Sequence, residues 1–489
     1  MVKTEKAYIQ VYMCLVIALF AWKSIDTVRF PFGADYGEAP LVDQARRIQD
    51  LSPLYKADLN QPPYVISNYP PLYPAFVAVL NFVSRIPLFQ AGRITSIMFA
   101  LISGYIIGLF TNRLTGKRWF GVFSAALFLG QPYVLFWSSL ARVDLMALAF
   151  SLLGLWILFR YKATLPSLIL GGLCFLCSAF TRQTYLLAGP LAGFAWLWCI
   201  DRKKALVFII SLSAAGLAIF GTINALTQGG FYINIVMSNI NQYSLAHTLS
   251  TSAQLFLLWP VVLFATLILV ILTIFSRFAP SPTEQIGLLR QPFVYSGLLF
   301  YTLGGLFSAF TIGKIGSNVN YLLELMSACA IWCGLGLGMI IHHKKTVQWA
   351  IFCLVAIQTI WVLANGYGLA RMTSLDLWGK QPNSANLQEK VQTAVKDGVV
   401  LSDDYMDLIV LSDQAVYYQP FEYGELYNAG MWDPDALVSQ IEKSEFPLII
   451  IGGTTLYKDC CWPMPVINAL EANYQIDKEP DALLLTPMK

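Results

Sequence analysis

Long apolar stretches recur along the chain from its start to about residue 366. Stretches of about 17–25 apolar residues are long enough to cross a bilayer as helices. The pattern predicts eleven membrane spans and a fold that is mainly α, a polytopic helical bundle. The first span runs from Tyr8 to Trp22, and the later ones centre on residues 94–111, 119–137, 145–159, 165–180, 185–200, 205–225, 254–275, 293–311, 321–341 and 347–366.

Basic residues mark alternate connectors between these spans. The basic connectors are 111–118, 160–162, 201–204, 276–292 and 342–345. The positive-inside rule places them in the cytosol, so the other connectors face outward. That outer set comprises 23–93, 138–144, 181–184, 226–253, 312–320 and everything after about residue 370. The N-terminal MVKTEK is also basic and no small-residue cleavage site follows, which predicts a retained anchor with a cytosolic N-terminus.

The segment LYPAFVAVLNFVSRIP (72–87) is also apolar, but it does not fit this alternation as a span. Counting it as a crossing would invert every later connector and move the basic ones outside. We therefore expect a juxtamembrane helix that lies at the outer surface.

The chain changes character after residue 370, where Asp, Glu, Asn and Gln become frequent and no segment is long enough to span. Residues 398–404, 446–453 and 482–487 are typical of short strands, and 433–443 of an amphipathic helix. We predict a transmembrane domain over 1–370 and a small α/β extracytoplasmic domain over 371–489. This second domain would either cap an outer cavity or recognise an acceptor, and its residues do not separate the two.

Composition agrees with a membrane protein and argues against a nucleic-acid partner. Hydrophobic residues make up 56% of the chain and charged residues 12%, far from the balance of a soluble domain. The net charge of +3 includes no basic run of the kind that binds nucleic acid.

The unusual polar residues all fall on the outer side of this predicted topology. Charged groups at membrane depth are expensive and usually line a functional cavity, so their convergence on one face predicts a site there. The set comprises Asp35, Glu38, Asn68, Arg93, Arg142, Asp144, Arg182, His247, Lys314, Asn318 and Asn320, with Glu324 near the top of a span.

Each part of this set also has a simpler interpretation. Asp35 and Glu38, in FGADYGEAPL, suit a general base beside a low-dielectric surface, or they merely precede a helix over 39–51 whose dipole favours acids. The SNYPPLYP element, with Asn68 and Tyr69, either contacts substrate or stiffens the start of the 72–87 helix.

Four basic residues at the outer ends of predicted spans also have two interpretations. They are Arg93, Arg142, Arg182 and Lys314. Each one alone is typical of an interfacial anchor whose charge reaches the headgroups. Together they could clamp a phosphate. Lys314 belongs to GKIGSNVNYLLE, where Asn318, Asn320 and Glu324 add further hydrogen-bonding groups.

Several of these motifs resemble a known family. DYGE in the first outer segment, YPPLYP after it, Arg93 opening the next span, LARVD in the second outer connector and the long 226–253 connector are similar to GT-C glycosyltransferases. The pattern is most similar to the protein O-mannosyltransferases and the aminoarabinose transferases that modify lipid A, of the family 39 type. The resemblance covers roughly residues 1–370.

The resemblance implies an inverting glycosyltransferase in the plasma (inner) membrane. It would move a sugar from a polyprenyl-phosphate donor in the bilayer to a glycan, glycolipid or protein acceptor at the outer face. Asp35 would be the general base and Glu38 its assistant or a substrate ligand, although which acid takes the proton stays open. Arg93, Arg142, Arg182 and Lys314 would neutralise the leaving phosphate, which needs positive charge where its negative charge develops. Asn68, Tyr69, Asp144, Asn318, Asn320 and Glu324 would contact substrate.

This sequence departs from the family pattern at two positions, which limits how far the family's residue roles apply to it. The relatives commonly have adjacent acids in the first loop, and commonly His or Lys where Tyr69 stands. Oligosaccharyltransferases of this superfamily bind a metal through an acid pair in the second outer loop, of which Asp144 matches only part. We therefore assign no metal ligands, and a divalent metal cofactor stays an open question.

Two other classes of protein remain as alternatives. A transporter or flippase of a lipid-linked sugar would show mid-membrane polar groups and an internal repeat, and neither is clear in the sequence. A non-catalytic receptor or scaffold would tolerate loss of Asp35.

Overall fold

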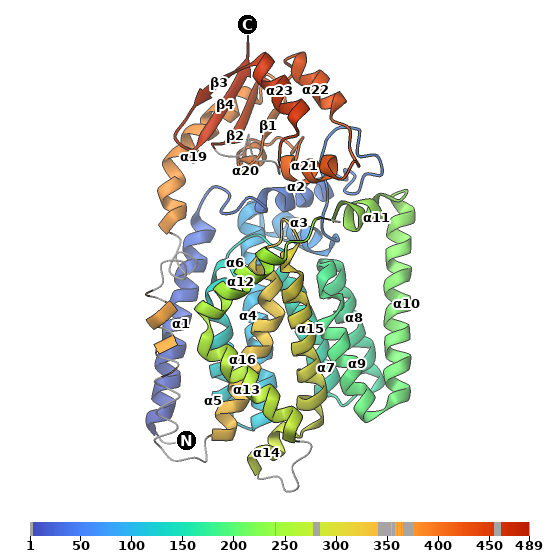
Figure 1. Cartoon of the computed structure of the whole chain (residues 1–489), viewed down its shortest axis with the longest axis vertical. Helices are drawn as coiled ribbons and strands as arrows, with labels where there is room; N and C mark the ends of the chain where they lie inside the picture. Colours follow the sequence, from blue (N-terminus) through green and yellow to red (C-terminus); the bar gives the residue numbers. More distant parts are fainter. Residues whose placement is uncertain are drawn as a thin grey trace.

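The structure is a computed structural model with a helical bundle and a small sheet domain at one end (Figure 1). It describes residues 3–239, 241–276, 284–340, 375–453 and 461–488, together with residues 354, 357, 358, 360–362 and 364. The helices of the bundle are α1 (Lys3–Arg29), α4 (Leu88–Thr115), α5 (Arg118–Leu129), α6 (Pro132–Ser138), α7 (Asp144–Arg160), α8 (Leu165–Thr181), α9 (Ala188–Ile200), α10 (Arg202–Leu226), α12 (Leu245–Leu258), α13 (Pro260–Ser276), α14 (Glu284–Leu289), α15 (Leu299–Phe310) and α16 (Leu323–Ile340).

The bundle is that of a multi-pass membrane protein. Within the described residues, five helices are long and apolar enough to cross a membrane, or up to seven if each of two bent helix pairs is one span. The spans predicted at 145–159, 165–180 and 185–200 are present as the shorter helices α7, α8 and α9, of 17, 17 and 13 residues. The span predicted at 347–366 lies largely outside the described residues.

Two spans that the sequence predicts as single helices are broken. The segment predicted at 119–137 forms α5 and α6, which meet at 70°, and the segment predicted at 254–275 forms α12 and α13, which meet at 99°. In both cases a proline, Pro132 or Pro260, begins the second helix. Proline lacks the N–H that would continue the preceding helix, and it disfavours helical geometry in the residue before it.

Short helices cover the end of the bundle that faces the sheet domain. The helices predicted over 39–51 and 72–87 are confirmed as α2 (Glu38–Gln49) and α3 (Leu72–Ser84). The other short elements at this end are η1 (Gln183–Leu186), α11 (Gly230–Ile235), η2 (Met237–Asn239), η4 (Thr311–Gly313) and η5 (Val319–Leu322), whereas the π-helical η3 (Phe293–Leu298) directly precedes α15 and contacts α14. In Figure 1, α2 and α3 lie between the bundle and the sheet domain.

The C-terminal domain is built on a four-stranded sheet in the order β1-β2-β4-β3. β1 pairs with β2 in parallel, and the other pairs are antiparallel. The strands predicted at 398–404, 446–453 and 482–487 are confirmed, as is the helix predicted at 433–443. The elements are α19 (Leu375–Ala394), β1 (Val400–Ser402), α20 (Met406–Leu411), α21 (Pro420–Asn428), α22 (Asp435–Glu442), β2 (Leu448–Gly452), α23 (Met464–Asn473), β3 (Tyr474–Lys478) and β4 (Ala482–Pro487).

The C-terminal domain is tied to the segment between α1 and α4 by polar contacts in both directions. The backbone of Tyr64 accepts from the N–H of Gln419 at 3.0 Å, and Asp43 accepts from the N–H of Val416 at 3.1 Å. Asp407 accepts from the N–H of Gly33 at 2.7 Å. These contacts hold α20 and α21 over the end of the bundle.

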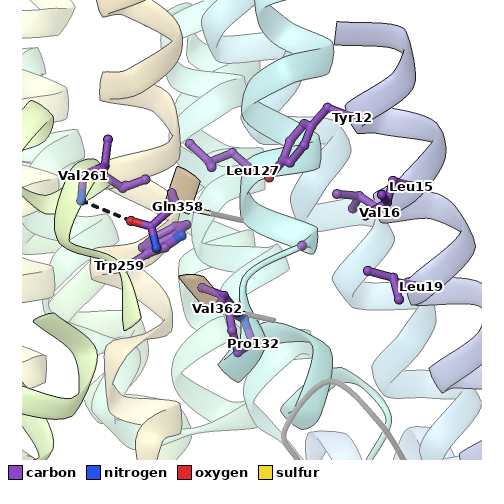
Figure 2. Close-up of a pocket in the computed structure, with 12 residues that line it drawn as sticks. Tyr12, Leu15, Val16, Leu19, Leu127, Pro132, Trp259, Val261, Gln358 and Val362 are labelled. Carbon is purple, nitrogen blue, oxygen red and sulfur yellow. Dashed lines mark hydrogen bonds between the residues drawn. The ribbon is translucent and has the colours of Figure 1, made fainter. Parts of the chain in front are cut away.

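A small apolar cavity of about 40 Å³ lies inside the bundle, between α1, α5 and α13 (Figure 2). Its lining is apolar except for groups such as Tyr12 and Gln358. The Gln358 side chain accepts from the N–H of Val261 at 3.1 Å and so satisfies a backbone donor at the start of α13. None of the described residues that line it is charged, so we treat this cavity as a packing feature of the bundle and not as a candidate site.

Candidate active site

A much larger cavity, of about 510 Å³, lies between the end of the bundle and the C-terminal domain. Its walls come from the segment between α1 and α4, the α6–α7 and α8–η1 connections, Asn239 and Asn241, residues 311–321 and the start of α21. Most of the residues predicted from the sequence meet here, although the segments that carry them are far apart in the chain. Those lining the cavity are Asp35, Asn68, Tyr69, Arg142, Arg182, Lys314, Asn318 and Asn320.

Glu38 and Arg93 form a buried pair behind the cavity wall. Both side chains are fully buried, and Arg93 Nη2 donates to Glu38 at 2.8 Å. All five Arg93 N–H donors are used, two on Glu38 and three on the carbonyls of Thr27, Phe30 and Phe32. Arg93 therefore has no free donor for a phosphate. The sequence predicted a phosphate contact for Arg93, whereas the structure places its side chain at the C-terminal end of α1, behind the cavity wall.

The hydrogen-bonding capacity of the Glu38 carboxylate is also fully used. Besides the two Arg93 donors, its carboxylate accepts from the backbone N–H groups of Ala34 at 2.7 Å and Ala141 at 2.6 Å. A carboxylate offers about four lone-pair sites, and here each is occupied. In this geometry Glu38 organises the loop that carries Asp35 and has no acceptor left for a substrate proton.

Asp35 lies at the cavity surface, and its side chain is 19% exposed. Oδ1 accepts from the N–H of Gly37 at 3.0 Å and forms an ion pair with Arg142. Within the described residues Oδ2 has no hydrogen-bond partner. A cradle of this kind fixes the carboxylate while leaving one oxygen for a ligand.

Arg142 is the cation next to Asp35. Its guanidinium lies over the ring of Trp137 at 5.2 Å, and its buried Nε has no partner among the described residues. Burial, together with the neighbouring positive charge of Arg182, lowers the pKa of Arg142 to about 9. An anion bound in the cavity would relieve both penalties.

Arg182 is held by an aromatic and acidic cage at the start of the α8–η1 connection. It forms an ion pair with Asp144 and lies 4.6 Å from the ring centre of Tyr321 and 5.8 Å from that of Tyr69. Asp144 also accepts from Asn320 Nδ2 at 3.0 Å. Asp144 is buried and does not line the cavity, so the structure makes it the support of Arg182 where the sequence predicted a substrate contact.

Lys314 supplies the third cavity cation from a turn rich in glycine. The N–H of Ser244 donates to the carbonyl of Gly313 at 2.7 Å, and the N–H of Ile315 donates to Gln242 at 2.9 Å. Burial and Arg182 lower the pKa of Lys314 from its ordinary value. No hydrogen bond to its Nζ is present within the described residues, so this ammonium is available to an anion.

Glu324, the last of the predicted substrate contacts, is directed into the bundle. It is buried at the first turn of α16 and accepts from Ser308 Oγ at 3.1 Å and from Ser151 Oγ at 3.5 Å. It does not line the cavity. Hydroxyl donors from α7 and α15 satisfy it, which gives it a role in joining helices.

The cavity also contains groups that the sequence analysis did not select. Glu422 of α21 accepts from Tyr36 Oη at 2.9 Å and from Asn68 Nδ2 at 3.3 Å. Burial raises the pKa of Glu422 to about 7. Gln183 and Tyr321 line the same cavity. Gln183 and Tyr321 could have been found as neighbours of Arg182 and Asn320, but nothing in the sequence separates Glu422 from other acids of its domain.

The described residues contain no group of three or more His, Cys, Asp or Glu side chains arranged to hold a metal ion. The one acid carried over from metal-binding relatives, Asp144, already accepts from Arg182, Trp137 and Asn320. We derive no step through a metal.

No protein-family model and no curated protein sequence matches the chain. Solved structures do. ArnT from Cupriavidus metallidurans in the apo state superposes with a TM-score of 0.62 at 11% identity, over 98% of this chain and 97% of that one. ArnT bound to undecaprenyl phosphate gives a TM-score of 0.62 at 11% identity, covering 98% of each chain.

A second match is the archaeal oligosaccharyltransferase AglB from Archaeoglobus fulgidus, in complex with an inhibitory peptide and a dolichol-phosphate. Its TM-score is 0.56 at 10% identity, over 100% of this chain and 74% of that one. These are membrane glycosyltransferases of the GT-C class, and the chain has the GT-C fold.

Proposed function

We propose that this protein is a membrane glycosyltransferase that transfers a sugar from a polyprenyl-phosphate donor to a hydroxyl-bearing acceptor. The observation that carries the proposal is the single cavity in which Arg142, Arg182 and Lys314 face Asp35. Asp35 pairs with Arg142 and Asp144 with Arg182, whereas Lys314 has no ion-pair partner within the described residues. A phosphate bound between the three cations would offset the cost of burying them. Solved proteins of the same fold were obtained with undecaprenyl phosphate and with a dolichol-phosphate, which supports a lipid-linked donor.

The residues suggest a direct displacement at the sugar. The acceptor oxygen attacks the anomeric carbon while the bond from that carbon to the phosphate oxygen breaks, with inversion. The phosphate leaves with the electron pair and gains negative charge, which Arg142, Arg182 and Lys314 stabilise. The acceptor proton passes to Asp35, whose Oδ2 is unoccupied. Glu38 has no acceptor left, so Asp35 is the base that this geometry supports.

We propose further that the cavity faces outward, with the N-terminus in the cytosol. In Figure 1 the N-terminus and α14 lie at the end of the bundle opposite the C-terminal domain. The basic connectors at 111–118 and 201–204 would then be cytosolic, as the positive-inside rule requires. A membrane-impermeant thiol reagent added to intact cells should label a cysteine introduced by Asp433→Cys and not one introduced by Lys117→Cys. The reverse pattern would contradict this orientation.

The direct test is transfer from radiolabelled polyprenyl-phosphate sugars by the purified protein in lipid nanodiscs. Asp35→Asn should lower turnover by at least about a hundredfold, the usual scale for loss of a general base. Asp50→Asn is the matched control, because Asp50 is an exposed acid at the end of α2 and outside the cavity. Full turnover by Asp35→Asn would reject Asp35 as the base. Failure of the wild type to consume any lipid-linked donor would reject the proposed class.

A further inference from the structure

The cavity has a second wall, made of hydrogen-bond acceptors. Glu422 accepts from Tyr36 on Oε2, from Asn68 on Oε1 and from its own backbone N–H, so one of its about four lone-pair sites remains open. It has no ion-pair partner within the described part of the chain. It is partly exposed, and it lines the cavity.

Two amide oxygens on the same wall have no hydrogen-bond partner among the residues that the structure describes. Asn68 donates its Nδ2 to Glu422, which fixes the orientation of the amide, and its Oδ1 is buried without a hydrogen bond. Gln183 donates its Nε2 to the carbonyl of Asn68 at 3.0 Å, and its Oε1 is likewise buried without a partner. Buried acceptors that lack a donor are rare in native proteins, and together they indicate a ligand that supplies donors.

This wall adjoins both the proposed phosphate-binding residue Arg182 and the proposed base Asp35. Gln183 follows Arg182 directly in the chain, and Tyr36, which donates to Glu422, follows Asp35. A group attached to a phosphate at Arg182 would therefore lie along these acceptors on its way to Asp35. Hydroxyl groups of a ligand are the hydrogen-bond donors that best suit one carboxylate and two amide oxygens in this position.

Resting on the proposed function, we propose that Glu422, Asn68 and Gln183 form a subsite for the hydroxyl groups of a sugar. The C-terminal domain thereby supplies a specificity-determining residue to the membrane-embedded site. Its α21 helix is held over the cavity by the contacts of Tyr64 and Asp43 described above. The sugar hydroxyls could belong to the donor or to the acceptor, and the chemistry of recognition is the same for both.

The experiment compares Glu422→Gln with wild type in nanodiscs, using two kinds of probe. The first is undecaprenyl phosphate without a sugar, beside a panel of undecaprenyl-phosphate pentoses and hexoses. The second is a panel of methyl glycosides added with saturating undecaprenyl phosphate. Glu425→Gln is the matched control, because Glu425 lies on the same helix and does not line the cavity.

Glu422→Gln should bind bare undecaprenyl phosphate as the wild type does. It should bind the best sugar-bearing ligand roughly tenfold more weakly, the scale of one hydrogen bond to a charged group. A loss confined to the lipid-linked sugars assigns the subsite to the donor, and a loss confined to the methyl glycosides assigns it to the acceptor.

Two outcomes would overturn the subsite. One is unchanged affinity for every sugar probe, and the other is an equal loss for bare undecaprenyl phosphate, which would make Glu422 a general support of the cavity. Gln183→Ala is the second variant and should show the same selective loss if Glu422→Gln does not fold. A wild type that fails to bind bare undecaprenyl phosphate would instead count against the proposed function, so the two failures are distinguishable.

Discussion

Replacing Glu38 with glutamine tests whether Glu38 has a structural role or acts as a general base, two roles that the sequence could not distinguish. Glu38 and Asp35 are three residues apart, and either could be a base on the sequence alone. In the structure Glu38 is fully buried and accepts two N–H groups of Arg93 and two backbone N–H groups. Glu38→Gln should therefore act first on stability, and Asp35→Asn on turnover.

The size of the effect follows from the count of contacts. Glutamine keeps one acceptor oxygen and replaces the other with an NH2 group, which faces N–H donors and cannot accept from them. Arg93 then stays buried beside a neutral partner. Removing one member of a buried ion pair costs about 3–5 kcal/mol, because the other charge is left uncompensated. For a chain of this size the melting temperature should fall on the order of 5 °C.

Thermal unfolding in nanodiscs is the assay, with donor turnover measured on the folded protein well below the transition. Because such unfolding is often irreversible, all variants should be compared at one heating rate. Asp35→Asn is the contrasting variant. Its ion pair with Arg142 is partly exposed, so it should melt closer to the wild type than Glu38→Gln does, and it should lose turnover. If Glu38→Gln melted as the wild type does and yet lost turnover completely, the structural role assigned to Glu38 would be refuted.

Two further predictions concern the cavity and its cover. Gly37→Ala should weaken binding of bare undecaprenyl phosphate roughly tenfold, because a Cβ at Gly37 would overlap the Arg142 guanidinium and displace it; unchanged binding in a direct titration would contradict this placement of Arg142. Burial raises the pKa of Asp407 to about 6, so the folded state holds the proton more tightly than the unfolded chain, and stability falls as pH rises from about 4 to about 6. The melting temperature of Asp407→Asn relative to wild type should therefore increase across that window and level off above it, and a difference that does not change with pH would exclude the coupling.

The sequence by itself determined the class of molecule and the end of the bundle where the candidate site lies. Apolar length, the placement of Lys and Arg and the turn signals around short apolar runs are local properties, so the helical bundle, the α2 and α3 helices and three strands of the C-terminal domain could be predicted from them. The convergence of Asp35, Arg142, Arg182 and Lys314 was also predicted, because each lies in a predicted outer connector or close to the outer end of a predicted span.

Only the tertiary structure decided which of these residues share a cavity and which hold its walls. Glu38 with Arg93, and Asp144 with Arg182, are pairs formed across distant parts of the chain, and a carboxylate looks the same in sequence whether its lone pairs are free or filled. Glu422 could not be foreseen, because its place depends on how the C-terminal domain packs against the segment between α1 and α4. Long-range packing satisfied some of the polar groups and left others open, and the open ones mark the candidate site.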